Sequence, residues 1–249
     1  MLVARDLSIR FGGVAAVQQV SLTVGPRRIV GLIGPNGAGK TTLFSLLSGF
    51  LRPESGSIVF LSHDITNMPP HAICRLGMTR TFQIVQPFAG QTVRDNIAVG
   101  AHLHHRRRSA ALHAAEDVAA RVGLTAELDK LAANLTIAGR KRLELARALA
   151  TQPQLLLLDE VLAGLNPQEI AEMIPVVRSI RASGVTIVMI EHVMQAVMSL
   201  ADIVHVLANG RMIASGSPAA IANDPAVIEA YLGRGTADKL RRAAESAHG

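Results

Sequence analysis

Aromatic residues and cysteine are scarce in this 249-residue chain, and each shortage limits what the protein can be. Phe, Trp and Tyr together make up 3% of the sequence and Trp is absent, so we expect a core built from Leu, Ile, Val and Ala. The single cysteine, Cys74, excludes a disulfide framework and is typical of a reducing compartment. We expect Cys74 to fill space in or near the core rather than to react.

Long apolar segments are also missing. The sequence contains no apolar run of membrane-spanning length, which favours a water-soluble chain that could still dock on a membrane protein. Residues 1–6 include no extended apolar region, so we expect no secretory leader there.

The formal net charge of +6 invites comparison with nucleic-acid-binding proteins. The basic residues are diffuse except at 104–108 and 239–242, and no aromatic side chains that could stack on bases interleave them. We therefore expect a solvated or partner-facing surface and no nucleic acid partner. His102, His104 and His105 have a spacing that could suit a metal, but no carboxylate or cysteine completes a site, so a solvated polybasic corner is favoured.

The sequence does contain a phosphate-binding loop. Residues 34–42 fit the pattern G-x-x-x-x-G-K-[ST], between a strand-like apolar run at 29–33 and a helix-capable run at 40–47. Glycines there let successive backbone N–H groups turn toward phosphate oxygens, and the helix N-terminus adds the positive end of its dipole. This setting predicts nucleotide binding rather than a chance Gly-rich turn. The loop consists of Gly34, Pro35, Asn36, Gly37, Ala38, Gly39, Lys40, Thr41 and Thr42.

Two kinds of strand pattern occur along the chain. Apolar and polar residues alternate at 2–9 and 20–24, which predicts antiparallel strands at the N-terminus. Continuous apolar runs at 155–158, 185–190 and 203–207 instead predict a parallel sheet buried on both faces by crossover helices. The expected fold class is therefore α/β, with a mostly parallel sheet, flanking helices and N-terminal antiparallel strands.

The segment from about residue 87 to residue 151 has a different character. It is rich in Ala, His and Arg, and its pattern predicts helices, so we expect an α-helical subdomain inserted into the α/β core. We place this whole domain at residues 1–235. Residues 236–249 carry charges and alanines without a clear apolar face and are expected to form a charged C-terminal tail.

Acidic side chains follow the strand at 155–158, where a nucleotide-hydrolysing site needs them. Asp159 should reach the carboxyl end of the strand, close to a Mg²⁺ ion held by the Thr41 hydroxyl, and Glu160 could hold the attacking water. Without the phosphate loop, two solvated acids in a loop would explain the pair equally well. His192, after the strand at 185–190, could reach the γ-phosphate, and Gln83 could contact both the metal and the helical insertion.

In this order the motifs resemble those of the ATP-binding cassette (ABC) ATPases, over residues 2–233. The resemblance implies a P-loop NTPase core that binds ATP and Mg²⁺, with Phe11 stacked on adenine and a signature segment that faces the ATP of a second subunit. It assigns Thr41, Gln83 and Asp159 to the metal, Lys40 to the β and γ oxygens, and Thr42 to the α-phosphate side. Glu160 and His192 serve hydrolysis. The signature segment is Leu135, Thr136, Ile137, Ala138 and Gly139.

Several short sequence segments resemble one branch of the family in particular, the cytoplasmic ATPases of branched-chain amino-acid importers. That branch implies a paired ATPase subunit, two membrane permeases, an extracytoplasmic solute-binding protein, and a peripheral position on the cytoplasmic face of the membrane. It also includes importers of urea, amides and other small polar solutes. These segments are Arg10-Phe11-Gly12-Gly13, Arg80-Thr81-Phe82-Gln83, Arg142 to Arg147, Ala163 to Pro167, Asn223 to Pro225 and Tyr231 to Gly233.

The chain departs from the family pattern at two places. The family's Leu-Ser-Gly-Gly-Gln is replaced by residues 135–139, in which Ile137 and Ala138 stand for two glycines. Because a β-branched residue cannot adopt a positive φ cheaply, the sequence leaves the conformation of this segment open, and any effect would fall on the partner's site. Val161 stands where the family usually has Pro, which could loosen the turn after Glu160.

Three rival functions remain open at this level. A soluble ABC ATPase of DNA repair or translation usually carries a long coiled-coil insertion or tandem cassettes, and neither is found here. A nucleotide-binding regulator that does not hydrolyse is disfavoured by Asp159, Glu160 and His192. An exporter or a urea or amide importer would use the same ATPase site, since the solute is selected by other subunits.

Overall fold

The computed structural model describes residues 1–84 and 86–232, so the predicted tail at 236–249 lies outside the described residues. Two sheets organise this part of the chain, one with four strands and one with six. Within it, no helix is both long enough and apolar enough to cross a membrane.

The four-stranded sheet is antiparallel and is formed by the N-terminal strands. Its order is β2 (Val14–Val24), β1 (Leu2–Phe11), β4 (Ser55–Phe60) and β5 (His63–Asp64). Buried side chains such as Leu2, Leu7 and Ile58 pack beneath it, which accounts for the apolar–polar alternation of these strands. The antiparallel N-terminal strands predicted from the sequence are confirmed.

The six-stranded sheet carries the phosphate loop. All neighbouring strands in it are parallel except β10, which pairs antiparallel with β9. Its order is β10 (Arg211–Gly216), β9 (Ile203–Ala208), β3 (Ile29–Ile33), β8 (Thr186–Ile190), β7 (Leu155–Asp159) and β6 (Met78–Arg80).

Both faces of this sheet are covered, which explains its continuous apolar strands. On β7, Leu156 and Leu158 belong to the core shared with the helices α5, α6 and α7, whereas Leu155 and Leu157 point into the core shared with α1 and the antiparallel sheet. The described helices outside the helical subdomain are α1 (Lys40–Leu47), α2 (Pro70–Arg75), α6 (Pro167–Ala182), α7 (Met194–Leu200), α8 (Pro218–Ala222) and α9 (Pro225–Leu232).

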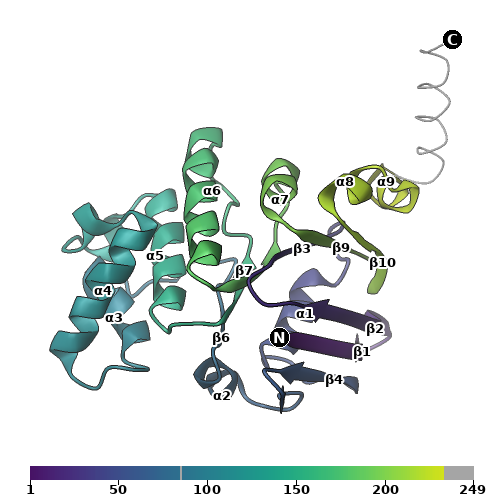
Figure 1. Ribbon diagram of the computed structural model, residues 1–249, viewed down its shortest axis with the longest axis horizontal. Helices are drawn as coiled ribbons and strands as arrows, with labels where there is room; N and C mark the ends of the chain where they lie inside the picture. Colours follow the sequence, from purple (N-terminus) through teal and green to yellow (C-terminus); the bar gives the residue numbers. More distant parts are fainter. Residues whose placement is uncertain (85, 233–249) are drawn as a thin grey trace, which may run out of the picture.

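The helical subdomain lies between β6 and β7 in the chain. It contains α3 (Val93–Ala101), α4 (Arg108–Val122) and α5 (Ile137–Leu149), together with short 3₁₀ turns at Thr125–Glu127 and Ala132–Asn134. These helices gather at one end of the molecule, and the antiparallel sheet lies toward the other (Figure 1). Small buried residues, among them Ala111, Ala115 and Ala146, let the helices pack closely. The predicted α/β fold with an inserted helical subdomain is confirmed.

Candidate active site

The phosphate loop joins the end of β3 to the start of α1 as predicted. Gly34 has φ 151° and Gly39 has φ 100°, a region that side chains with a Cβ rarely adopt. A Cβ on Gly34 would lie 2.0 Å from the carbonyl oxygen of Leu207, and one on Gly39 would lie 2.3 Å from the carbonyl oxygen of Ala16. Glycine is therefore required at both positions by backbone conformation and by space.

Lys40 is a buried cation at the N-terminus of α1. Its Nζ donates to the carbonyl oxygens of Gly34, at 2.8 Å, and Pro35, at 3.0 Å. Burial lowers the pKa of Lys40, and the nearby carboxylates of Glu160 and Asp159 partly oppose that shift. Gly34 and Pro35 thus hold the lysine, whose positive charge lies where a bound phosphate would need it.

A pocket of about 1210 Å³ opens over this loop. It brings together predicted residues from the phosphate loop, the segment after β6, and the ends of β7 and β8. The predicted residues that line it are Asn36, Gly37, Ala38, Gly39, Lys40, Thr41, Thr42, Gln83, Glu160 and His192.

The opposite wall of the pocket was missed from the sequence. It is formed by the β1–β2 turn and the start of β2, with the β9–β10 turn at Asn209-Gly210. The Gly210 N–H donates to the carbonyl oxygen of Ala38 at 3.0 Å, and Gln18 N–H donates to the carbonyl oxygen of Gly210 at 2.7 Å. An Asn-Gly pair between two strand patterns is a strong hairpin signal, and it could have located this turn.

Phe11 is half exposed at the end of β1, and it is not among the described residues that line the pocket. Its register partner Val14, 69% exposed, does line the pocket. Phe11 therefore lies next to a residue that lines the pocket, and its stacking on adenine stays a prediction.

Two of the predicted residues, Gln83 and His192, contact a third, Glu160. His192 Nε2 lies 2.9 Å from Oε1 of Glu160, and Gln83 Nε2 donates to Oε2 at 2.7 Å. The Glu160 side chain is 12% exposed, whereas the His192 side chain is 42% exposed. A carboxylate oriented by an imidazole and a carboxamide, at the edge of a phosphate site, can accept a proton from a water molecule.

The backbone of Glu160 is held in an unusual conformation. Its φ of 51° is left-handed, which is uncommon for a residue with a side chain. The Glu160 N–H donates to the carbonyl oxygen of Ile190 at 2.9 Å, and the buried Lys141 Nζ donates to the Glu160 carbonyl oxygen at 2.8 Å. Lys141 also reaches the Gln83 carbonyl oxygen at 3.3 Å, so it links two parts of the site. This role of Lys141 was not predicted from the sequence.

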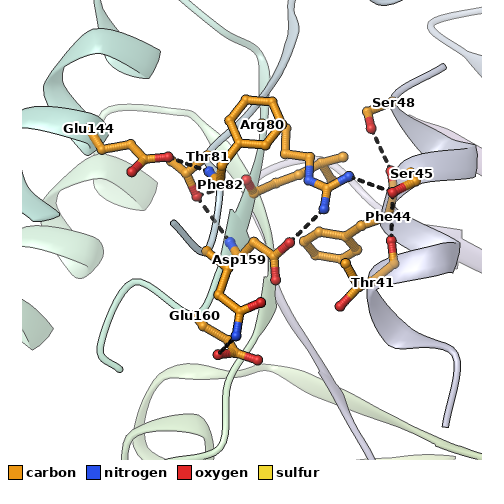
Figure 2. Close-up of polar contacts among 12 residues, drawn as sticks. Thr41, Phe44, Ser45, Ser48, Arg80, Thr81, Phe82, Glu144, Asp159 and Glu160 are labelled. Atoms are coloured by element: carbon orange, nitrogen blue, oxygen red, sulfur yellow. Dashed lines mark hydrogen bonds and ion pairs between the residues drawn. The ribbon is translucent and has the colours of Figure 1, made fainter. Parts of the chain in front are cut away.

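Asp159 is 1% exposed and carries an ion pair that was not predicted. Arg80 Nη2 lies 2.6 Å from its Oδ2, whereas Oδ1 is buried without a hydrogen-bond partner among the described residues (Figure 2). An unpaired buried carboxylate oxygen is costly unless something binds it. Carboxylate and hydroxyl oxygens are ligands that Mg²⁺ accepts, so Asp159 and Thr41 fit the expected metal.

The signature segment begins a helix. Thr136 caps α5, accepting the Gly139 N–H at 3.1 Å, and Ile137 is the first helical residue. Neither Ile137 nor Ala138 is among the described residues with positive φ, so neither carries the strain that a positive φ would cause. The replacement of glycine is tolerated because a helical N-terminus requires no left-handed residue.

These signature residues lie away from the phosphate loop. Leu135, Thr136, Ala138 and Gly139 line a separate hollow of about 420 Å³, which they share with residues at the N-terminus of α6 such as Asn166. Ile137 is 61% exposed. The chain thus presents two distinct surfaces, one with the phosphate loop and one with the signature.

The turn after Glu160 contains Val161, which was expected to loosen it. Val161 is 4% exposed and packs in the core with Leu162, and the Ala163 N–H closes the turn onto the Glu160 carbonyl oxygen at 3.2 Å. Glu191 is buried beside this turn and accepts the Leu162 N–H at 2.9 Å. Burial raises the pKa of Glu191 to about 7.

The polybasic corner shows local hydrogen bonds. His102 Nδ1 lies 2.9 Å from the His105 carbonyl oxygen, and His104 Nε2 lies 3.0 Å from the Thr151 carbonyl oxygen. Across residues 1–84 and 86–232 there is no group of three or more His, Cys, Asp or Glu side chains placed to hold a metal ion.

A mostly parallel sheet with this phosphate loop, an antiparallel N-terminal sheet and an inserted helical subdomain defines an ABC ATPase. Residues 17–163 match the family model for ABC transporters, and residues 211–237 match the model for branched-chain amino acid ATP-binding cassette transporters. The chain belongs to the ABC transporter family, as an ATP-binding and ATP-hydrolysing subunit of the branched-chain amino acid type.

Relatives of known name support this assignment. The chain is 41% identical to the high-affinity branched-chain amino acid transport ATP-binding protein LivG of Salmonella typhimurium, over 94% of this chain and 98% of LivG. It is 38% identical to BraF of Pseudomonas aeruginosa, with the same coverage of both chains. A solved ATP-binding cassette of an ABC transporter in its ADP conformation superposes with a TM-score of 0.85, at 30% identity over 94% of this chain and 99% of the other.

Proposed function

We propose that this chain hydrolyses ATP to energise the import of branched-chain amino acids or a related small polar solute. The observation that carries the proposal is the convergence of Gln83 and His192 on the Glu160 carboxylate, beside the phosphate loop. The match of the C-terminal segment to the branched-chain model, and the names of LivG and BraF, support the choice of solute.

In this proposal the phosphate loop binds the nucleotide through backbone N–H groups of residues 36–41, and Lys40 binds its β and γ oxygens. Hydrogen bonds to the Gly34 and Pro35 carbonyl oxygens hold the Lys40 ammonium, and its positive charge favours a phosphate chain over a neutral ligand. Thr42 lies beside the α-phosphate.

The proposed Mg²⁺ ligands are Thr41, Gln83 and Asp159. Their support is the unpaired Oδ1 of Asp159 together with a hollow that Thr41, Gln83 and Asp159 line in common. When bound, Mg²⁺ would neutralise charge that develops on the β and γ oxygens.

Hydrolysis needs a water molecule activated in line with the γ-phosphate. Glu160 is the proton acceptor in this proposal, because its carboxylate lies in the pocket and both of its oxygens are oriented by neighbours. His192 keeps this carboxylate in place and lies where it can contact the γ-phosphate. A general base of this kind contributes about 10² to 10⁴ in rate.

A second ATPase subunit completes each site in the proposal. The separation of the signature hollow from the phosphate loop supports a head-to-tail dimer, because a signature that cannot reach its own nucleotide can serve a partner's. Two membrane permeases and an extracytoplasmic solute-binding protein would complete the importer. The chain would then lie on the cytoplasmic face of the membrane as a peripheral subunit.

Reconstitution tests the solute assignment. The chain would be co-purified with its partner ATPase and permeases, inserted into proteoliposomes, and supplied with the binding protein of the same transporter. We expect ATP-dependent uptake of labelled leucine that exceeds uptake of labelled urea. Transport of urea or acetamide alone would assign the chain to a different importer, and movement of a solute out of the cytoplasmic side would indicate an exporter. Recovery with nucleic acid or ribosomes instead of permeases would contradict a transport role.

A further inference from the structure

Arg80 lies at the end of β6 with its guanidinium between the elements that carry the proposed metal ligands. Nη2 contacts Asp159 Oδ2 at 2.6 Å, and Nη1 donates to Ser45 Oγ at 2.9 Å. Ser45 Oγ in turn donates to the Thr41 carbonyl oxygen at 2.8 Å. Figure 2 shows this chain of contacts running from β7 through Arg80 to α1.

The Arg80 side chain is shielded from solvent and closely surrounded by other side chains. The Arg80 side chain is 6% exposed, and its guanidinium lies 5.7 Å from the ring centre of Phe44 and 5.5 Å from that of Phe82. Aromatic faces of this kind stabilise a desolvated cation. Two rings and two hydrogen-bond partners leave the guanidinium little freedom to turn.

We propose that Arg80 is a positioning residue for the divalent metal site, an inference that rests on the proposed metal role of Thr41 and Asp159. By occupying Oδ2, Arg80 fixes the Asp159 carboxylate so that Oδ1 is the oxygen left for the metal. By reaching Ser45, it also sets the separation between α1, which carries Thr41, and β7, which carries Asp159.

A planar guanidinium suits this task because it can donate in two directions at once, whereas an ammonium is a point charge on a flexible stem. The simpler alternative is that the ion pair only holds β6 to β7. Buried ion pairs can often be replaced by apolar residues without loss of stability, so stability alone cannot separate these roles. The metal affinity can separate them.

The test measures Mn²⁺ binding to the full chain in the presence of ATP, by electron paramagnetic resonance of free Mn²⁺. Nucleotide affinity is measured separately in EDTA. For Arg80→Met we expect the Mn²⁺ affinity to fall by about tenfold or more, with unchanged ATP affinity in EDTA. For Arg80→Lys we expect a smaller loss, because the charge remains but the bridge to Ser45 is broken.

Arg94→Met is the matched control. Arg94 likewise contacts two side chains, the carboxylates of Glu116 and Asp129, but it does so within the helical subdomain, so its loss is expected to leave Mn²⁺ binding unchanged. Equal Mn²⁺ affinity in Arg80→Met and the natural chain would overturn the inference. If Arg80→Met does not fold, Arg80→Lys and Ser45→Ala decide, and natural Mn²⁺ affinity in both of them overturns it. If the natural chain shows no ATP-dependent Mn²⁺ binding, the proposed metal site itself fails, independently of Arg80.

Discussion

His192 Nε2 and Glu160 Oε1 lie 2.9 Å apart, although the two residues follow different strands of the sheet. Glu160 follows β7 and His192 follows β8, which are parallel neighbours, so their carboxyl ends meet at one edge. Parallel pairing therefore brings an acid and an imidazole together beside the phosphate loop without any sequence proximity.

Replacing His192 with Ala should slow hydrolysis while leaving ATP binding intact. The imidazole holds one oxygen of the Glu160 carboxylate, and its loss leaves that oxygen to water. We expect phosphate release to fall by about 10²-fold or more in the assembled transporter. The control is His113→Ala, since His113 is 80% exposed in the helical subdomain. Equal rates for the two variants would remove His192 from the reaction.

Lys141 should contribute more to stability than an exposed lysine does. Its Nζ donates to the carbonyl oxygens of Glu160 and Gln83, and the residue is 7% exposed. Lys141→Met would leave both carbonyl groups without this donor, at a cost of about 1–3 kcal/mol in the free energy of unfolding. Urea denaturation measures this loss. Lys130→Met, which breaks an exposed pair with Glu127, should cost less than about 1 kcal/mol.

Glu191 should make stability depend on pH. Its pKa is about 7 in the fold against 4.5 in the unfolded chain, so the folded state binds the extra proton between these values. The contribution of Glu191 to the free energy of unfolding is therefore fully present below pH 4.5 and declines as the pH rises toward 7. The total loss above pH 7 is of the order of 3 kcal/mol.

Glu191→Gln keeps an oxygen to accept the Leu162 N–H but cannot ionise. Urea denaturation at pH 5.5 and pH 8 should show a smaller difference in unfolding free energy for Glu191→Gln than for the natural chain. Parallel behaviour of the two proteins across this range would show that Glu191 is not the responsible group.

The sequence was sufficient to predict the elements that carry strong local signals. The apolar runs on β3, β7, β8 and β9 and the Gly-rich loop gave both the parallel sheet and the location of the phosphate site. Glu160 and His192 could be predicted because the apolar pattern of a strand indicates where the carboxyl end of that strand lies. The short strand β6 (Met78–Arg80) has too few residues to show a clear period.

The sequence could not predict contacts that depend on packing between distant segments. Arg80 and Lys141 look like ordinary basic residues until the fold buries them beside Asp159 and the Glu160 backbone. The adenine-stacking role of Phe11 was predicted from family resemblance alone and stays a prediction, because no nucleotide contact tests it. The sequence left the conformation at Ile137 open, and the structure shows a helix there that Thr136 caps.

The central claim is that Glu160 accepts the proton in ATP hydrolysis, and Glu160→Gln tests it most directly. The variant keeps the size of the side chain and removes its basicity, and Glu116→Gln in the helical subdomain is the control. ATP affinity and phosphate release would be measured in the assembled transporter. We expect natural ATP affinity with phosphate release reduced by about 10²- to 10⁴-fold. Phosphate release at the natural rate in Glu160→Gln would contradict it.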